Sequence, residues 1–216
     1  WNPTFNSEAG VQALQFFVDL YNAKAVPAGV PNYTWDDTGL GFGSGSVAMA
    51  LDWGGWASYF NDPANSKVAG NVGVIRAPKG SGGKRTGWAG SHSFSITEGC
   101  DNKEAAASFL TFLTSYDNQM VEARKGLLPT RTKVWDDIKA EFNTAGNTFG
   151  VEVLDTFQAS MAEDAFTPPL IPEWIEVSNV LWPKLQAAIV GDMSAKDALD
   201  AAQVEAATIM HDAGYN

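Results

Sequence analysis

Tryptophan side chains are the residues in this sequence best suited to contact a ligand, and there are eight of them in 216 residues. Trp53 and Trp56 lie in a glycine-containing turn that follows a short apolar run. Trp88 lies between glycines, and Trp174 closely follows a proline. In α/β proteins, ligands collect beyond the carboxyl ends of strands, where loops present side chains that the core does not need. We therefore expect these tryptophans to line a cleft.

Polar side chains accompany the same tryptophans. The flat face of an indole ring matches the C–H faces of a sugar ring, and carboxylate, hydroxyl and imidazole groups bond sugar hydroxyls. The combination predicts carbohydrate binding, with Trp53, Trp56, Trp88 and Trp174 as the aromatic residues and Asp52, Ser91, His92 and Glu173 as the polar ones. The alternative is that tryptophans fill the core, which is what we expect of Trp135 and Trp182.

Several other chemistries do not fit the sequence. Net charge is −11 with no Lys/Arg run, so we expect no nucleic-acid partner. One cysteine and two histidines predict neither a disulfide nor a metal site. The Gly83-Lys84 pair lacks the Ser/Thr and the earlier glycine of a phosphate-binding loop, so no nucleotide and no other cofactor is expected.

Acidic pairs provide the alternative interpretation, a glycan-active enzyme domain that uses paired carboxylates. The pairs are Asp36-Asp37, Asp136-Asp137 and Glu163-Asp164. A glycosidase needs two carboxyl groups that face one bond across about 5–9 Å, whereas adjacent residues diverge. We expect each pair to be solvated surface charge. His92 between two serines likewise lacks an identifiable base and oxyanion hole, so no catalytic residue is predicted.

Hydrophobic patterning predicts an α/β fold. Short apolar runs predict strands at 47–51, 71–75 and 93–96, and the glycine-rich segment 79–90 predicts a flexible loop. Helical spacing predicts helices at 7–22, from 102 onward, from Ser115 to Gly126, at 149–162 and at 173–190, with a final helix that begins after Ser194.

Six stretches together resemble, in order and spacing, the second half of the sugar-binding proteins of bacterial ABC importers. This is the extracellular solute-binding family that includes maltose-binding protein. The stretches that carry the resemblance are Phe42–Met49 with Gly54–Trp56, Ser66–Gly73, Gly87–Gly90, Asn102–Ala106, Phe109–Ser115 and Leu128–Arg131.

The resemblance implies the second lobe of a two-lobed clamp, a periplasmic-binding-protein-like lobe with a helical crossing segment. Residues 1–90 and 145–216 would form this second lobe, and residues 91–144 would complete the first lobe, whose N-terminal part would be largely absent. Such a chain would expose apolar surface that a second copy could cover, so self-association is expected.

The resemblance also implies a role and a site. It implies a non-catalytic bacterial receptor, periplasmic or lipid-anchored at the cell surface, that closes on a sugar and delivers it to a membrane permease of the ABC transporter class. The stacking tryptophan of the family maps onto Trp56, with Trp53 as its neighbour. The glycine-rich edge maps onto Trp88, Gly90, Ser91 and His92, and the start of the late helix maps onto Trp174.

Overall fold

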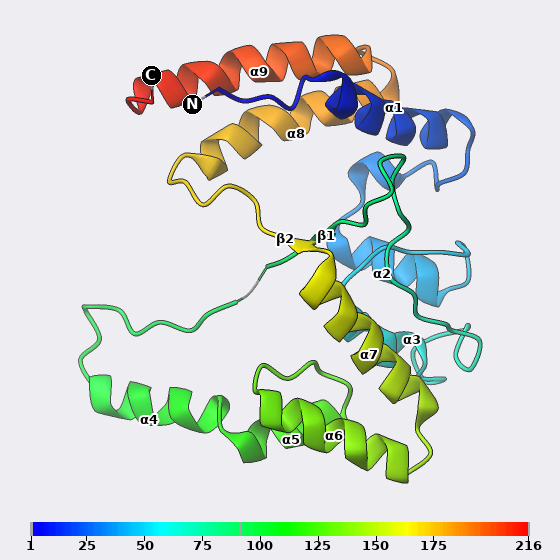
Figure 1. The fold of residues 1–216 in the computed structure, drawn as a ribbon, viewed down its shortest axis with the longest axis vertical. Helices are drawn as coiled ribbons and strands as arrows, with labels where there is room; N and C mark the ends of the chain where they lie inside the picture. The colour runs from blue at the N-terminus through cyan, green and yellow to red at the C-terminus, as the bar shows by residue number, and fades with distance from the viewer. Residues whose placement is uncertain (1, 91, 216) are drawn as a thin grey trace. The chain divides into compact units, whose positions relative to one another are not determined.

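Two compact units make up the chain in the computed structural model, which describes residues 2–90 and 92–215. The first unit combines the N-terminal segment up to Thr38 with the segment from Pro169 onward, and the second comprises Gly39–Pro168. Figure 1 shows the order of the elements. The boundaries of these units differ from those of the predicted lobes, whose assignment remains a prediction.

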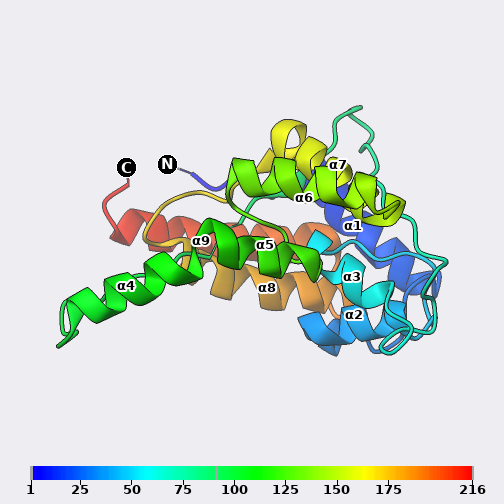
Figure 2. The same ribbon diagram turned by 90° about the horizontal axis from the view of Figure 1, so that it is seen from below.

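The first unit is helical. Its helices are α1 (Glu8–Asn22), α8 (Trp174–Val190) and α9 (Ala195–Asp212), with a 3₁₀ turn at Val30–Asn32. Helices α8 and α9 form a hairpin, and α1 packs against both (Figures 1 and 2). Ala198, Ala202 and Ala206 are fully buried, and their small side chains let α9 pack closely against its neighbours.

Capping residues fix the helix ends where the sequence predicts them. The Ser7 hydroxyl accepts a hydrogen bond from the Gly10 N–H, and Ser194 accepts one from Asp197 N–H. Gly191, with a φ of 90°, ends α8 in the left-handed conformation that glycine adopts without strain. Both predicted starts and this predicted end are confirmed.

Helices also dominate the second unit, around a core of Met120, Ala123, Val134, Ile138 and Leu154. Helix α6 packs against both α5 and α7. Helix α2 begins four residues before the boundary between the units and ends in the second. The elements are α2 (Trp35–Gly43), the 3₁₀ turn Gly54–Trp56, α3 (Ala57–Phe60), α4 (Lys103–Leu113), α5 (Tyr116–Arg124), α6 (Thr132–Thr144) and α7 (Thr148–Glu163).

The β structure of the described residues is one short parallel pair, β1 (Gly87–Trp88) with β2 (Ala165–Phe166). Part of the predicted loop 79–90 is therefore a strand. The strands predicted at 47–51, 71–75 and 93–96 are wrong, since those described residues have no strand partner. A strand needs a neighbour for its backbone hydrogen bonds, and an apolar run cannot supply one. Met49 and Ile75 are accordingly exposed.

Of the two tryptophans predicted to lie in the core, one packs against it and the other is exposed. Trp135 is half-buried and packs against the core of the second unit, as predicted. Trp182 is 62% exposed, so that prediction is wrong. Its neighbour Leu181 packs on the core of the first unit, and successive helical residues are about 100° apart, which turns Trp182 away. None of the described helices is long and apolar enough to cross a membrane.

Replacing Ile138, which is fully buried in the core of the second unit, tests this packing. Ile138→Ala should lower the free energy of unfolding by about 2–5 kcal/mol, because it removes apolar contacts and leaves a cavity. Urea denaturation followed by circular dichroism measures the change. Ile138→Val, the matched control, should cost about 0.5–1.5 kcal/mol. Equal midpoints for Ile138→Ala and the unchanged chain would contradict the assigned core.

Candidate functional site

The turn that carries Trp53 is built on a glycine. The Asp52 carboxylate accepts a hydrogen bond from the Trp53 N–H at 2.7 Å, which fixes the start of the turn. A Cβ at Gly55 would lie 2.3 Å from the Trp53 indole, so the ring lies directly against this backbone. The Trp53 side chain remains 45% exposed. The turn therefore presents an indole ring to solvent in a defined position.

Trp56 is more enclosed than Trp53. Its ring stacks on Phe60, with centroids 5.6 Å apart and planes 7° apart, and meets the edge of Tyr59 at 5.2 Å. A Cβ at Gly39 would approach the Trp56 ring to 3.0 Å, so here too a glycine leaves room for an indole. Trp56 is thus half-buried in an aromatic cluster, which holds its ring rigidly.

Trp88 lies on β1 and is 76% exposed. A Cβ at Gly90 would lie 3.2 Å from its ring, so the indole extends along the backbone of the residues that follow it. This is a third pairing of indole and glycine. Gly90 therefore leaves room for the Trp88 ring, because a Cβ at this position would lie in tight contact with it.

A cavity of about 530 Å³ lies in the second unit. His92, Leu128 and residues of α4 and α5 line it. Leu128 also lies near Gly54, since a Cβ at Gly54 would come within 3.3 Å of the Leu128 side chain. The turn that holds Trp53 therefore packs against a residue of the cavity wall. Ser91 of the predicted site lies outside the described residues.

Glu173 and Trp174 belong to the first unit. Trp174 begins α8 and packs, half-buried, against Val177, Ala206 and Met210. Glu173 lies directly before α8. The pKa of the Tyr215 phenol is raised, first by burial of the phenol and then by the nearby Glu173 carboxylate. The structure thus brings Asp52, Trp53, Trp56, Trp88, Gly90 and His92 into one compact unit, while Glu173 and Trp174 lie in the other.

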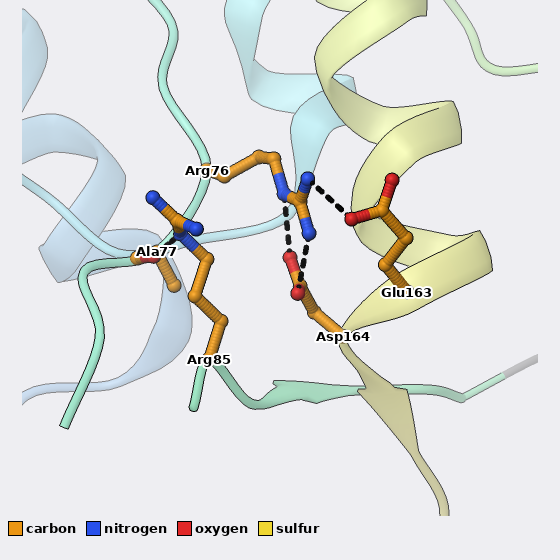
Figure 3. Close-up of polar contacts among 5 residues, drawn as sticks. All are labelled: Arg76, Ala77, Arg85, Glu163 and Asp164. Carbon is orange, nitrogen blue, oxygen red and sulfur yellow. Dashed lines mark hydrogen bonds and ion pairs between the residues drawn. The ribbon is translucent and has the colours of Figure 1, made fainter. Parts of the chain in front are cut away.

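A charged cluster anchors β1, and we call it the Arg76 clasp (Figure 3). The Arg76 guanidinium donates two hydrogen bonds to the Asp164 carboxylate, at 2.8 and 2.6 Å, and its third nitrogen lies 2.8 Å from a Glu163 oxygen. The Asp164 main-chain oxygen accepts a hydrogen bond from Gly87 N–H at 2.8 Å. Arg85 donates to the Ala77 carbonyl at 2.8 Å and closes the base of the intervening loop.

The clasp corrects the prediction that Glu163-Asp164 is solvated surface charge. Asp164 is buried, at 7% exposure, and Arg76 holds the pKa of its carboxyl below the ordinary value. The two carboxylates also raise the pKa of the Arg76 guanidinium. Both acids of this pair are engaged with Arg76. Sequence analysis missed Arg76, because residues 76 and 164 are joined only by the fold.

Other candidate chemistry is sparse in the part of the chain that the structure describes. No group of three His, Cys, Asp or Glu side chains there is placed to hold a metal ion. Cys100 is a free thiol, and His211 is largely exposed. In a second cluster, Asp137 accepts from both Tyr116 and Lys133. Both bonds lower the pKa of Asp137, and the bond to Asp137 raises the pKa of Tyr116.

Comparison with known proteins places the chain in a family context. The family model described as bacterial extracellular solute-binding protein matches residues 1–120. The mannitol-binding protein of Pseudomonas aeruginosa is 27% identical over the whole chain, and the match covers 51% of that protein. A probable amino-acid ABC transporter periplasmic-binding protein of Sinorhizobium fredii is 27% identical over 99% of the chain and 46% of its own length.

A solved structure of a T. maritima protein with bound maltose is also similar. It is 33% identical to this chain, has a TM-score of 0.78, and the match covers 95% of this chain and 51% of that one. The predicted α/β fold class and the predicted resemblance are thereby confirmed. The chain spans about half the length of the curated relatives that it matches.

Acidification should weaken the Arg76 clasp. Because the folded-state pKa of Asp164 is lowered, its contribution to stability is present above the ordinary value of 3.8 and is lost as pH falls through the lowered pKa. Asp164→Asn should therefore lower the melting temperature near pH 7 and should differ less from the unchanged chain near pH 3. Thermal denaturation across this range measures the difference. A constant difference would contradict an ionised Asp164.

Proposed function

This chain belongs to the bacterial extracellular solute-binding protein family, and we propose that it forms part of a non-catalytic receptor for a sugar or a sugar alcohol. The observation that carries the proposal is the pair of exposed indoles, Trp53 and Trp88, each lying against a glycine. An indole face binds the C–H face of a sugar, and a ring held by its backbone loses little freedom on binding. The mannitol-binding and maltose-bound relatives favour the same ligand class.

The remaining predicted residues have complementary roles in this proposal. Asp52 and His92 would bond hydroxyl groups, as would Ser91 and Glu173, and Trp56 and Trp174 would add aromatic surface. We propose that the ligand is bound between two lobes that close around it, so that both lobes bury it. Because the chain spans about half of its relatives' length, the second wall of this site would come from the other half of a two-lobed receptor.

The biological setting follows from the family. A family of extracellular solute-binding proteins implies a location outside the cytoplasm. We propose that the receptor is periplasmic or held at the bacterial cell surface by a lipid, and that it delivers its ligand to an ABC-transporter permease. A receptor returns its ligand unchanged. Incubation with oligosaccharides followed by product analysis therefore separates this proposal from the glycan-active enzyme.

Tryptophan substitutions test the proposed site in the two-lobed receptor that carries this chain. A thermal-shift screen against sugars, sugar alcohols and amino acids identifies the ligand. Trp53→Ala and Trp88→Ala should then each weaken binding by about 10-fold or more in calorimetric titration, because each removes a stacking surface. Trp182→Ala, an equally drastic change at an exposed tryptophan outside the site, should leave the affinity unchanged.

Three results would contradict the proposal. Stabilisation by amino acids alone would show that the ligand class is wrong. Full affinity in both Trp53→Ala and Trp88→Ala would show that the assigned indoles do not contact the ligand. Reduced affinity in all three variants, including Trp182→Ala, would point to a general loss of structure and would also contradict the assignment.

Self-association of the isolated chain is a separate proposal. Helix α4 has no buried residue, and Phe109 and Phe112 are 58% and 61% exposed. We propose that copies of the chain cover these faces against one another, because water disfavours so much exposed apolar surface. Light scattering should give a mass above that of one chain, and Phe109→Glu with Phe112→Glu should lower it. A monomer before substitution would contradict the proposal.

A further inference from the structure

We propose that the Arg76 clasp positions the Trp88 edge of the ligand site, with Arg76 and Asp164 as positioning residues that do not themselves touch ligand. The inference deepens the proposed function and rests on it. Arg76 and Asp164 lie far apart in sequence, and neither belongs to the predicted set of ligand-binding residues. Their effect on a ligand would pass through β1.

Asp164 joins both ends of the loop between residues 76 and 87. Its carboxylate accepts two hydrogen bonds from Arg76, where the loop begins. Its main-chain oxygen accepts one from Gly87 N–H, where the loop ends. Asp164, at the end of α7, therefore fixes the distance between the two ends of this loop. The planar guanidinium of Arg76 allows one orientation for the bidentate pair.

Burial distinguishes the two acids of the clasp. The Asp164 side chain is 6% exposed and the Arg76 side chain is 24% exposed, whereas Glu163 is 62% exposed. A charged hydrogen bond that is shielded from water is stronger than one at the surface. Asp164 is therefore the principal partner of Arg76, and the exposed Glu163 makes a further contact with the guanidinium (Figure 3).

The backbone on each side of Trp88 is hydrogen-bonded to the segment from Asp164 to Phe166. Gly87 N–H donates to the Asp164 main-chain oxygen, and Ala89 N–H donates to the Phe166 oxygen at 2.8 Å. These two bonds fix the backbone on each side of Trp88, and Gly90 lies against the ring itself. A strand pair of two residues each has little stability alone. The ion pair at its start therefore supplies the anchoring that so short a ladder lacks.

Hydrogen exchange tests the clasp without any ligand. In the full chain, Arg76→Met should speed exchange of the Gly87 and Ala89 amides by about 10-fold or more, while amides of α6 keep their rates. Arg124→Met is the matched control, because Arg124 makes a comparable bidentate pair with Glu141 elsewhere in the same unit. It should leave Gly87 and Ala89 unchanged. Arg76→Lys, which keeps the charge, should restore part of the protection.

Three exchange results would overturn the proposal. Unchanged exchange at Gly87 and Ala89 in Arg76→Met would show that the clasp does not hold β1. Faster exchange throughout, including α6, would show that Arg76 supports the whole unit and has no local positioning role. The same acceleration in Arg124→Met would show that the effect is not specific to the clasp.

Ligand titration in the two-lobed receptor tests the consequence for binding. Using the sugar or sugar alcohol identified by the thermal-shift screen, Arg76→Met should weaken binding by about 10-fold, and Arg124→Met should not. Equal affinity for Arg76→Met and the unchanged receptor would overturn the positioning role. Failure of the unchanged receptor to bind any member of the panel would contradict the proposed function and the ligand role of the clasp together. The exchange result would still report the mechanical role of the clasp.

Discussion

The absence of a Cβ beneath three indole rings is the constraint on which the candidate site depends. Trp53 lies against Gly55, Trp56 lies close to Gly39, and the Trp88 ring extends along Gly90. A Cβ at Gly55 would overlap the Trp53 ring at 2.3 Å, and a Cβ at Gly39 or Gly90 would lie in tight contact with the Trp56 or Trp88 ring, at 3.0 and 3.2 Å. Glycines in a helix, a turn and the predicted loop 79–90 therefore each leave room for an aromatic side chain.

Charge pairing supplies the second constraint, because short irregular segments carry most of these tryptophans. Trp88 lies on a strand of two residues, which a buried carboxylate and a bidentate arginine anchor to the end of α7. The Trp53 turn packs against Leu128, which lies between α5 and α6, and against Phe157 of α7. The helices thus form a scaffold, and the loops that they hold present the chemistry.

Helices with capping signals were predictable because these signals are local, whereas α2 (Trp35–Gly43) was not predicted. Ser7, Ser194 and Gly191 mark helix ends by hydrogen bonds or backbone angles within a few residues, and the structure places those ends as predicted. Strands were not predictable, because an apolar run such as 71–75 becomes a strand only when another strand pairs with it. Trp182 was misassigned because its apolar neighbours face the core while its own helical position does not.

The residue types of the candidate site were predictable from the sequence. The ion pair that anchors the backbone beside Trp88 was not. Tryptophans beside glycines and polar side chains predicted a ligand site, and the family match shows that the chain belongs to a family of solute-binding proteins. The Glu163-Asp164 pair appeared to be surface charge, because nothing near residue 164 in the sequence identifies Arg76 as its partner. Only the fold joins these residues, and with them the two ends of the loop that leads to Trp88.

In the proposed site, the Trp53 and Trp88 indoles contact the ligand directly. Nuclear magnetic resonance can test this contact by following the chemical shifts of the indole N–H groups in the two-lobed receptor as a sugar or sugar alcohol that binds is added. The Trp53 and Trp88 signals should shift with the ligand while the Trp182 signal stays in place. Saturable binding that leaves both Trp53 and Trp88 signals unmoved would contradict the proposed contact.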